Sequence, residues 1–154
     1  MVTALLILHG LVAVALIGAI SHQTLAAWAP AEAGPKSFFG RFRSVPPAAF
    51  ANAVVALYVI SALLGAIVYL DFRTEVQPIL ERDGHWHAIG LFDLKEHFIA
   101  IGLALLPAYW LCWRRAHANE WGRTRAALTA VLAFVVWFGF LMGHVLNNIL
   151  GFGS

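Results

Sequence analysis

Three histidines lie inside long apolar stretches of the sequence, where an ionisable side chain is costly. They are His9 in LLILHGL, His97 in LKEHF and His144 in FLMGHVL. A neutral imidazole offers one ring nitrogen as a ligand for a metal ion or for the iron of a haem. Ionisable residues in apolar helices are therefore candidates for a functional site.

Polar neighbours accompany two of these histidines. His144, Asn147 and Asn148 are spaced i, i+3 and i+4, which places them on one face of a helix. An asparagine there is expected to hold a ring nitrogen and fix the tautomer, as ligating histidines usually require. Glu96 precedes His97 directly, about 100° away around the helix, and is the third polar residue expected around the site.

The composition indicates a membrane protein. Of 154 residues, 61% are hydrophobic and 12% are charged, and the mean hydropathy is +0.78. Soluble domains are about half apolar and about a quarter charged. The pI of about 9.0 does not indicate a nucleic-acid partner, because the basic residues gather in two loops. The single cysteine excludes an internal disulfide and the CxxCH attachment of a c-type haem.

Four apolar runs are long enough to cross a bilayer as helices, which takes about 20 residues. They cover about 2–22, 47–70, 94–113 and 126–149. The sequence therefore predicts an all-α integral membrane protein, with one domain over 1–154 and four transmembrane helices in an up-down bundle. Small residues four apart, such as Gly139 and Gly143, are expected to let helices approach closely.

Charges predict the orientation. Loops 30–46 and 114–125 hold seven Lys and Arg residues, whereas the other side holds three, together with six acids. The positive-inside rule places these loops in the cytoplasm and both termini outside, in a bacterial-type inner (cytoplasmic) membrane. Four tryptophans near the cytoplasmic boundary resemble an aromatic belt: Trp28, Trp110, Trp113 and Trp121.

Helix geometry predicts that the three histidines lie at similar depths. At a rise of 1.5 Å per residue, His9 lies roughly 12 Å from the outer end of the first helix. His97 lies about one turn into the third helix and His144 about one to two turns from the end of the fourth. The sequence thus predicts one cluster in the outer half of the bundle. Asp93, Lys95 and Glu96 are expected to mark the start of the third helix, where acids favour the dipole.

A second site at the opposite end is not expected. His22 follows His9 by 13 residues, an offset typical of a helix that ligates two stacked haems. A second haem would need another histidine on the cytoplasmic side. His117 is the only candidate there, and it lies in a basic loop.

The four-span layout, with histidines inside the helices, resembles small four-helix membrane cytochromes b and the haem-anchoring subunits of respiratory complexes. The resemblance covers the layout alone, and no ligand assignment follows from it. It implies an electron-transfer subunit, an oxidoreductase component if the protein is an enzyme, within a larger respiratory or photosynthetic complex. Lipid and other membrane subunits would be its partners.

The first hypothesis is therefore one b-type haem in the outer half of the bundle. The first and third helices are diagonal in an up-down bundle, so His9 and His97 could clamp a haem between them. The pair of His97 and His144 is nearly as suitable. In the first arrangement His144 would serve a haem propionate, a quinone or a proton path. The aromatic residues expected to pack on the macrocycle are Tyr58, Tyr69, Trp137 and Phe140.

Two alternatives remain open. His9, His97 and His144 together could hold copper or zinc, with an open coordination position that suits a catalytic or transfer site. The protein could instead be a structural accessory subunit without a cofactor, whose polar residues only hold the helices together.

The predicted orientation is testable with reporters. A C-terminal fusion to a reporter that is active only outside the cytoplasm should be active, because the positive-inside rule leaves the C-terminus outside. The matched fusion within loop 114–125 should be inactive. Activity of a cytoplasm-dependent reporter at the C-terminus would contradict the orientation.

Overall fold

The computed structural model describes residues 2–28, 46–114 and 121–149, and every regular element in them is helical. The long helices are α1 (Val2–Trp28), α3 (Pro47–Asp71), α5 (Trp86–Arg114) and α6 (Gly122–Ile149). A π-helical turn, η1 (Phe72–Val76), and a short helix, α4 (Gln77–Arg82), connect α3 to α5. The all-α prediction is confirmed.

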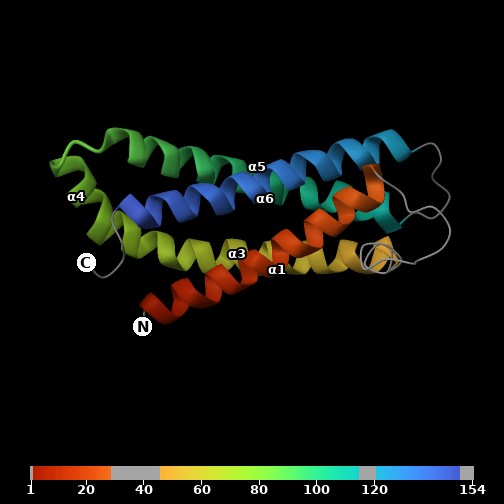
Figure 1. Cartoon of the computed structure of the whole chain (residues 1–154), viewed down its shortest axis with the longest axis horizontal. Helices are drawn as coiled ribbons and strands as arrows, with labels where there is room; N and C mark the ends of the chain where they lie inside the picture. The colour runs from red at the N-terminus through yellow and green to blue at the C-terminus, as the bar shows by residue number, and fades with distance from the viewer. Residues whose placement is uncertain (1, 29–45, 115–120, 150–154) are drawn as a thin grey trace.

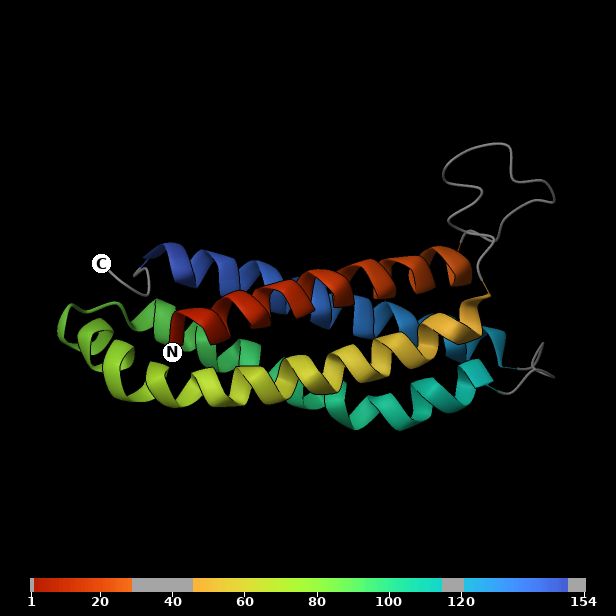
Figure 2. The same cartoon turned by 90° about the horizontal axis from the view of Figure 1, so that it is seen from below.

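The long helices run up and down beside one another (Figures 1 and 2). α1 packs against α3 and α6, and α5 packs against the same two helices, so α1 and α5 are diagonal. The beginning of α1 and the end of α6 lie at the end of the bundle where α4 is found (Figure 1). We refer to this as the α4 end.

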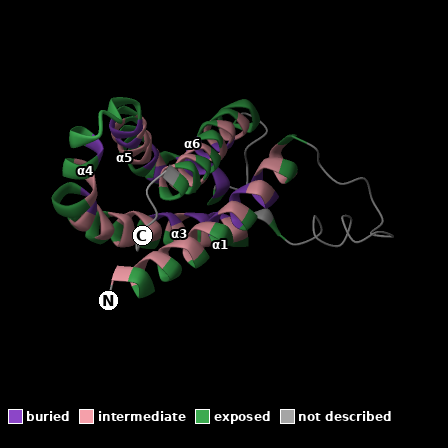
Figure 3. Ribbon diagram, turned by 60° about the vertical axis from the view of Figure 1, so that its left-hand side comes forward, coloured by how far each residue is buried: buried purple, intermediate pink, exposed green. Residues whose placement is uncertain are grey.

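Among the described residues, three helices are long and apolar enough to cross a membrane by length and composition. They are α1, the continuous run Ala48–Arg82 and residues Gly122–Asn148 of α6. Large apolar side chains are exposed on these helices, and Leu11 is 64% exposed. Figure 3 shows where the exposed residues lie along the ribbon. Such a surface suits lipid and not water. The helices are consistent with a multi-pass membrane protein.

Three helix boundaries differ from the predicted spans. The first helix continues past residue 22 to Trp28, the third begins at Trp86 and not near 94, and the fourth begins at Gly122 and not near 126. Hydropathy identifies the residues that fit the hydrocarbon core of a bilayer. The helical hydrogen bonds continue beyond those residues. Lys95 and Glu96 are therefore in the body of α5 and not at its start.

The connection between α3 and α5 closes the α4 end. The N–H of Gln77 donates to the carbonyl of Phe72, an i−5 bond that forms the π turn. Pro78 has no N–H and its ring would crowd the carbonyl of Thr74, which accounts for the wider turn. Gly84, with φ of 77°, then reverses the chain into α5.

Two buried clusters hold the helices. The larger lies along the bundle axis and includes Tyr58, Leu132 and Val135. The smaller lies at the α4 end, where Phe72 stacks on Phe92 with 3.7 Å between ring centroids. This stack fixes the connecting segment against α5.

The closest approach of α3 and α5 requires a glycine. The hydroxyl of Tyr58 donates to the carbonyl of Ile99 at 3.0 Å. A Cβ built on Gly102 would lie 1.9 Å from that hydroxyl oxygen. No side chain larger than hydrogen fits there without movement of the ring.

Replacing Gly102 by alanine should therefore destabilise the bundle by about 1–3 kcal/mol through overpacking. The measurement is the thermal unfolding midpoint in a mild detergent. Gly90→Ala is the control in the same helix, because nothing described lies within 4 Å of its added Cβ; it should leave the midpoint unchanged or raise it. Equal midpoints for the two variants would contradict this account of the contact.

Candidate functional site

Two adjoining cavities lie inside the bundle, in the half nearer α4. The larger, the chamber, has a volume of about 250 Å³, and the smaller, the niche, about 80 Å³. They share six lining residues: His9, Ala13, Gly65, Lys95, Gly139 and Phe140. Because these come from all four long helices, the cavities form a continuous site around the bundle axis.

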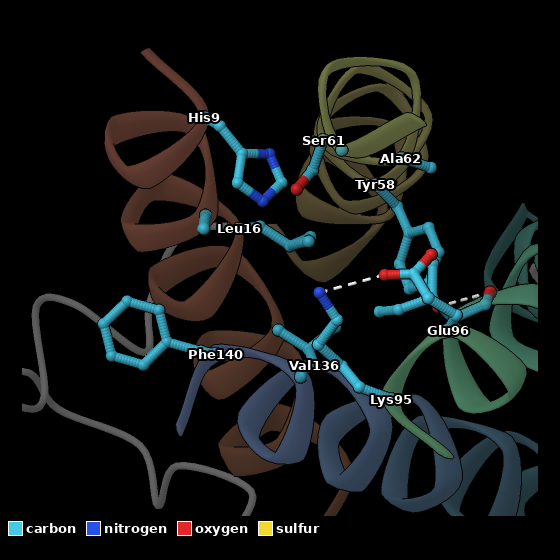
Figure 4. Close-up of a pocket in the computed structure, with 13 residues that line it drawn as sticks. His9, Leu16, Tyr58, Ser61, Ala62, Lys95, Glu96, Val136 and Phe140 are labelled. Atoms are coloured by element: carbon cyan, nitrogen blue, oxygen red, sulfur yellow. Dashed lines mark hydrogen bonds and ion pairs between the residues drawn. The ribbon is translucent and has the colours of Figure 1, made fainter. Parts of the chain in front are cut away.

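The niche is the polar part of this site (Figure 4). His9 reaches it from α1, Ser61 from α3, and Lys95 and Glu96 from α5. The Nζ of Lys95 lies 2.9 Å from Oε1 of Glu96 and 4.1 Å from the centre of the Phe92 ring. An ammonium group inside this bundle of apolar helices is therefore held by an ion pair and an aromatic face.

His9 is held between α1 and α3. A Cβ added to Gly65 would lie 3.4 Å from Cε1 of the His9 ring, so the glycine makes room for the imidazole. The Nδ1 atom of His9 is buried and forms no hydrogen bond within the described part of the chain. The imidazole thus retains bonding capacity that the protein does not use.

The chamber is mainly apolar, with aromatic and glycine residues in its wall. Tyr69, Phe72 and Phe92 contribute rings, and α6 contributes His144 and Asn147. A Cβ on Gly10 or Gly143 would meet none of the described atoms within 4 Å, whereas on Gly139 it would lie 3.1 Å from Ile99. Gly139 thus allows the close helix approach that the sequence predicts, but Gly143 borders open space in the chamber.

The structure brings His9 and His144 to the chamber and leaves His97 outside both cavities. His97 and His144 are both exposed, but His97 lines neither cavity, and its Nδ1 donates to the carbonyl of Asp93 at 2.6 Å. Lys95 faces the cavities, and two residues further along a helix point about 200° away. His97 consequently lies on the side of α5 that faces away from the cavities.

The predicted polar neighbours are also divided. Asn147 lines the chamber and Glu96 lines the niche. Asn148 lines neither and donates to the backbone carbonyl of His144 at 3.0 Å. Among the aromatic residues, Tyr58, Tyr69 and Phe140 line the cavities, whereas Trp137 is exposed.

Sequence reasoning did not include Lys95 in the site. It interpreted Lys95 as a marker of the helix start, because the apolar run begins near residue 94. Helix α5 begins eight residues earlier, at Trp86. A lysine in the interior of an apolar helix is the signal that would have identified it.

Within residues 2–28, 46–114 and 121–149, no group of three or more His, Cys, Asp or Glu side chains is placed to hold a metal ion. The outward direction of His97 explains this. The alternative of a copper or zinc site made by His9, His97 and His144 therefore has no support in the structure.

The opposite end of the bundle is tightly packed. His22 is fully buried, and its ring stacks on Phe50 with 3.8 Å between centroids. Nearby in the core, Nε1 of Trp113 donates to Oγ1 of Thr129 at 3.1 Å. His117, the other histidine considered there, lies outside the described residues. His22 is accounted for as a packed core histidine.

Comparisons with known proteins found no matching family model, no matching characterised protein and no matching solved structure.

The ion pair between Lys95 and Glu96 leads to a prediction about the stability of the bundle. Glu96→Gln leaves the Lys95 ammonium, whose side chain is 16% exposed, without its anion, whereas Lys95→Met leaves a carboxylate whose side chain is 35% exposed. Glu96→Gln should therefore destabilise more, by about 1–3 kcal/mol. The double variant should recover part of this loss. Thermal unfolding of the three variants measures it, and a double variant less stable than Glu96→Gln would contradict the pairing.

Proposed function

We propose that the protein is a membrane-embedded electron-transfer subunit that binds one b-type haem in the chamber, where His9 and His144 would hold it. The observation that carries the proposal is that these two imidazoles, from α1 and α6, line a single cavity. A pair of imidazoles on facing helices is a common way for a helix bundle to hold haem. This pair differs from the two pairs that the sequence suggested, because each of those included His97, which points away from the chamber.

Properties of the chamber support a flat, largely apolar ligand. Glycines from three helices border it, so a rigid ring system can approach the backbone. Tyr69, Phe92 and Phe140 offer aromatic surfaces. Together the chamber and the niche reach the lower end of the roughly 300–1,000 Å³ range of ligand pockets. The unpaired Nδ1 of His9 is available for an additional hydrogen bond.

When bound, a haem supplies a one-electron redox centre. The protein supplies the surroundings that make the centre useful. His9 and His144 would hold and orient the group, and the mainly apolar wall, which includes the buried Phe72 and Leu80, would limit its contact with water. Burial and the charge of Lys95 set the electrostatic environment. Electrons would come from and pass to other membrane subunits or a quinone within a larger respiratory or photosynthetic complex.

The proposal includes four membrane crossings, with α5 as the fourth, in a bacterial-type inner membrane. The support is the concentration of basic residues opposite the α4 end, where the described residues include Arg114, Arg123 and Arg125. Trp28 and Trp121 are exposed at the same end, as expected for side chains at a membrane interface. The α4 end and both termini would then lie outside.

The spectrum of the purified protein tests the haem. Wild-type protein, prepared from membranes in mild detergent, should show a reduced-minus-oxidised b-type absorbance and bound iron. His9→Ala and His144→Ala should each abolish it, because each removes one axial ligand. Gly143→Phe should also reduce it strongly, because the ring would fill the chamber.

His97→Ala is the matched control, because His97 has a similar depth but lies outside the cavities. It should keep the absorbance. A wild-type protein without colour or iron would refute the haem and leave the structural accessory subunit as the remaining hypothesis. Loss of the absorbance in His97→Ala but not in His144→Ala would refute the ligand pair.

A further inference from the structure

Lys95 occupies an unusual position, at the junction of the chamber and the niche. It lines both cavities, and its side chain is 16% exposed. A lysine in an apolar helix normally extends its amine towards water. Here the amine points into the bundle, towards His9 and Glu96 (Figure 4). Its charge is therefore directed at whatever occupies the cavities.

The anion that balances this charge is Glu96, the adjacent residue on the same helix. Of the described residues that line the two cavities, Lys95 and Glu96 are the only Lys, Arg, Asp or Glu side chains. Neighbouring residues on a helix do not normally face each other. The Nζ of Lys95 nevertheless lies 2.9 Å from Oε1 of Glu96, and Glu96 lines only the niche.

Lys95 and Glu96 differ in how strongly each depends on the opposite charge of the other. The side chain of Glu96 is 35% exposed and can be stabilised by other polar contacts, whereas that of Lys95 is 16% exposed and needs an anion within the cavity. An ammonium has three donors, and Glu96 provides one oxygen at 2.9 Å. Lys95 therefore retains capacity for a second anionic acceptor from the chamber side.

We propose that Lys95 is an anion-binding residue of the cavity, which receives a carboxylate of an otherwise apolar ligand, and that Glu96 balances its charge when no ligand is bound. If the ligand is haem, which rests on the proposed function, the carboxylate is a haem propionate. A fatty acid also presents a carboxylate on an apolar molecule that enters a membrane. In both cases the apolar part of the ligand occupies the chamber and the carboxylate reaches the junction.

The test compares each acid with its ester. Protein from which any bound haem has been extracted is placed in lipid nanodiscs. It is titrated at about pH 8, where carboxylates are ionised, with haem, haem dimethyl ester, laurate and methyl laurate, and binding is followed by quenching of tryptophan fluorescence. The ratio of acid to ester affinity is compared between variants, so that partition of each ligand into lipid cancels. Wild-type protein should prefer an acid over its ester by about tenfold or more.

Lys95→Met should bring this ratio to that of free partition, and Lys95→Arg should keep it. Glu96→Gln should raise it, because the competing carboxylate is removed while the ammonium stays. The double variant Lys95→Met with Glu96→Gln leaves no unpaired charge in the cavity and should also lose the preference for the acid, so the test does not depend on the folding of Lys95→Met alone. Arg82→Gln removes one positive charge from an exposed site and should leave the ratio unchanged.

The outcomes separate the two proposals. Haem binding with equal affinity for acid and ester in the wild type, or a preference that survives Lys95→Met, would refute the role of Lys95 and leave the haem site intact. Absence of binding by both haem forms would refute the proposed function, and the laurate pair would then decide the role of Lys95. Absence of binding by all four ligands would refute both.

Discussion

The structure depends on one constraint, which is that a charged side chain inside a bundle of apolar helices must be compensated there. Lys95 meets this constraint through Glu96, at 2.9 Å, and through the face of Phe92. Phe92 in turn stacks on Phe72, which begins the π turn that closes the α4 end. The charge of Lys95 in the cavity and the π turn that closes the α4 end are thus linked through one set of contacts around α5.

Glycines make the space that this charge faces. Gly102 allows Tyr58 to bring α3 against α5, and Gly65 makes room for the ring of His9. Gly10 and Gly143 instead border open volume. A core that is closely packed around Tyr58 and hollow near α4 is what a bundle needs in order to hold a ligand without losing stability.

The fold was predictable from the sequence because long apolar runs in lipid must form helices. Helix rise converts sequence position into position along the bundle, so it could also suggest that His9 and His144 come near one another, and both line the chamber. The direction of His97 was not, because it depends on the rotation of α5 about its axis. Lys95 was missed because hydropathy places the start of the third helix near residue 94, whereas hydrogen bonding begins it at Trp86.

The central claim is that His9 and His144 hold one b-type haem. The most direct measurement is the electron paramagnetic resonance spectrum of the oxidised protein, with hyperfine resolution, after labelling of histidine alone with nitrogen-15. A haem held by His9 and His144 should give a low-spin ferric signal coupled to two labelled imidazole nitrogens, from one iron per chain. Absence of a haem iron signal, or coupling to fewer than two histidine nitrogens, would contradict it.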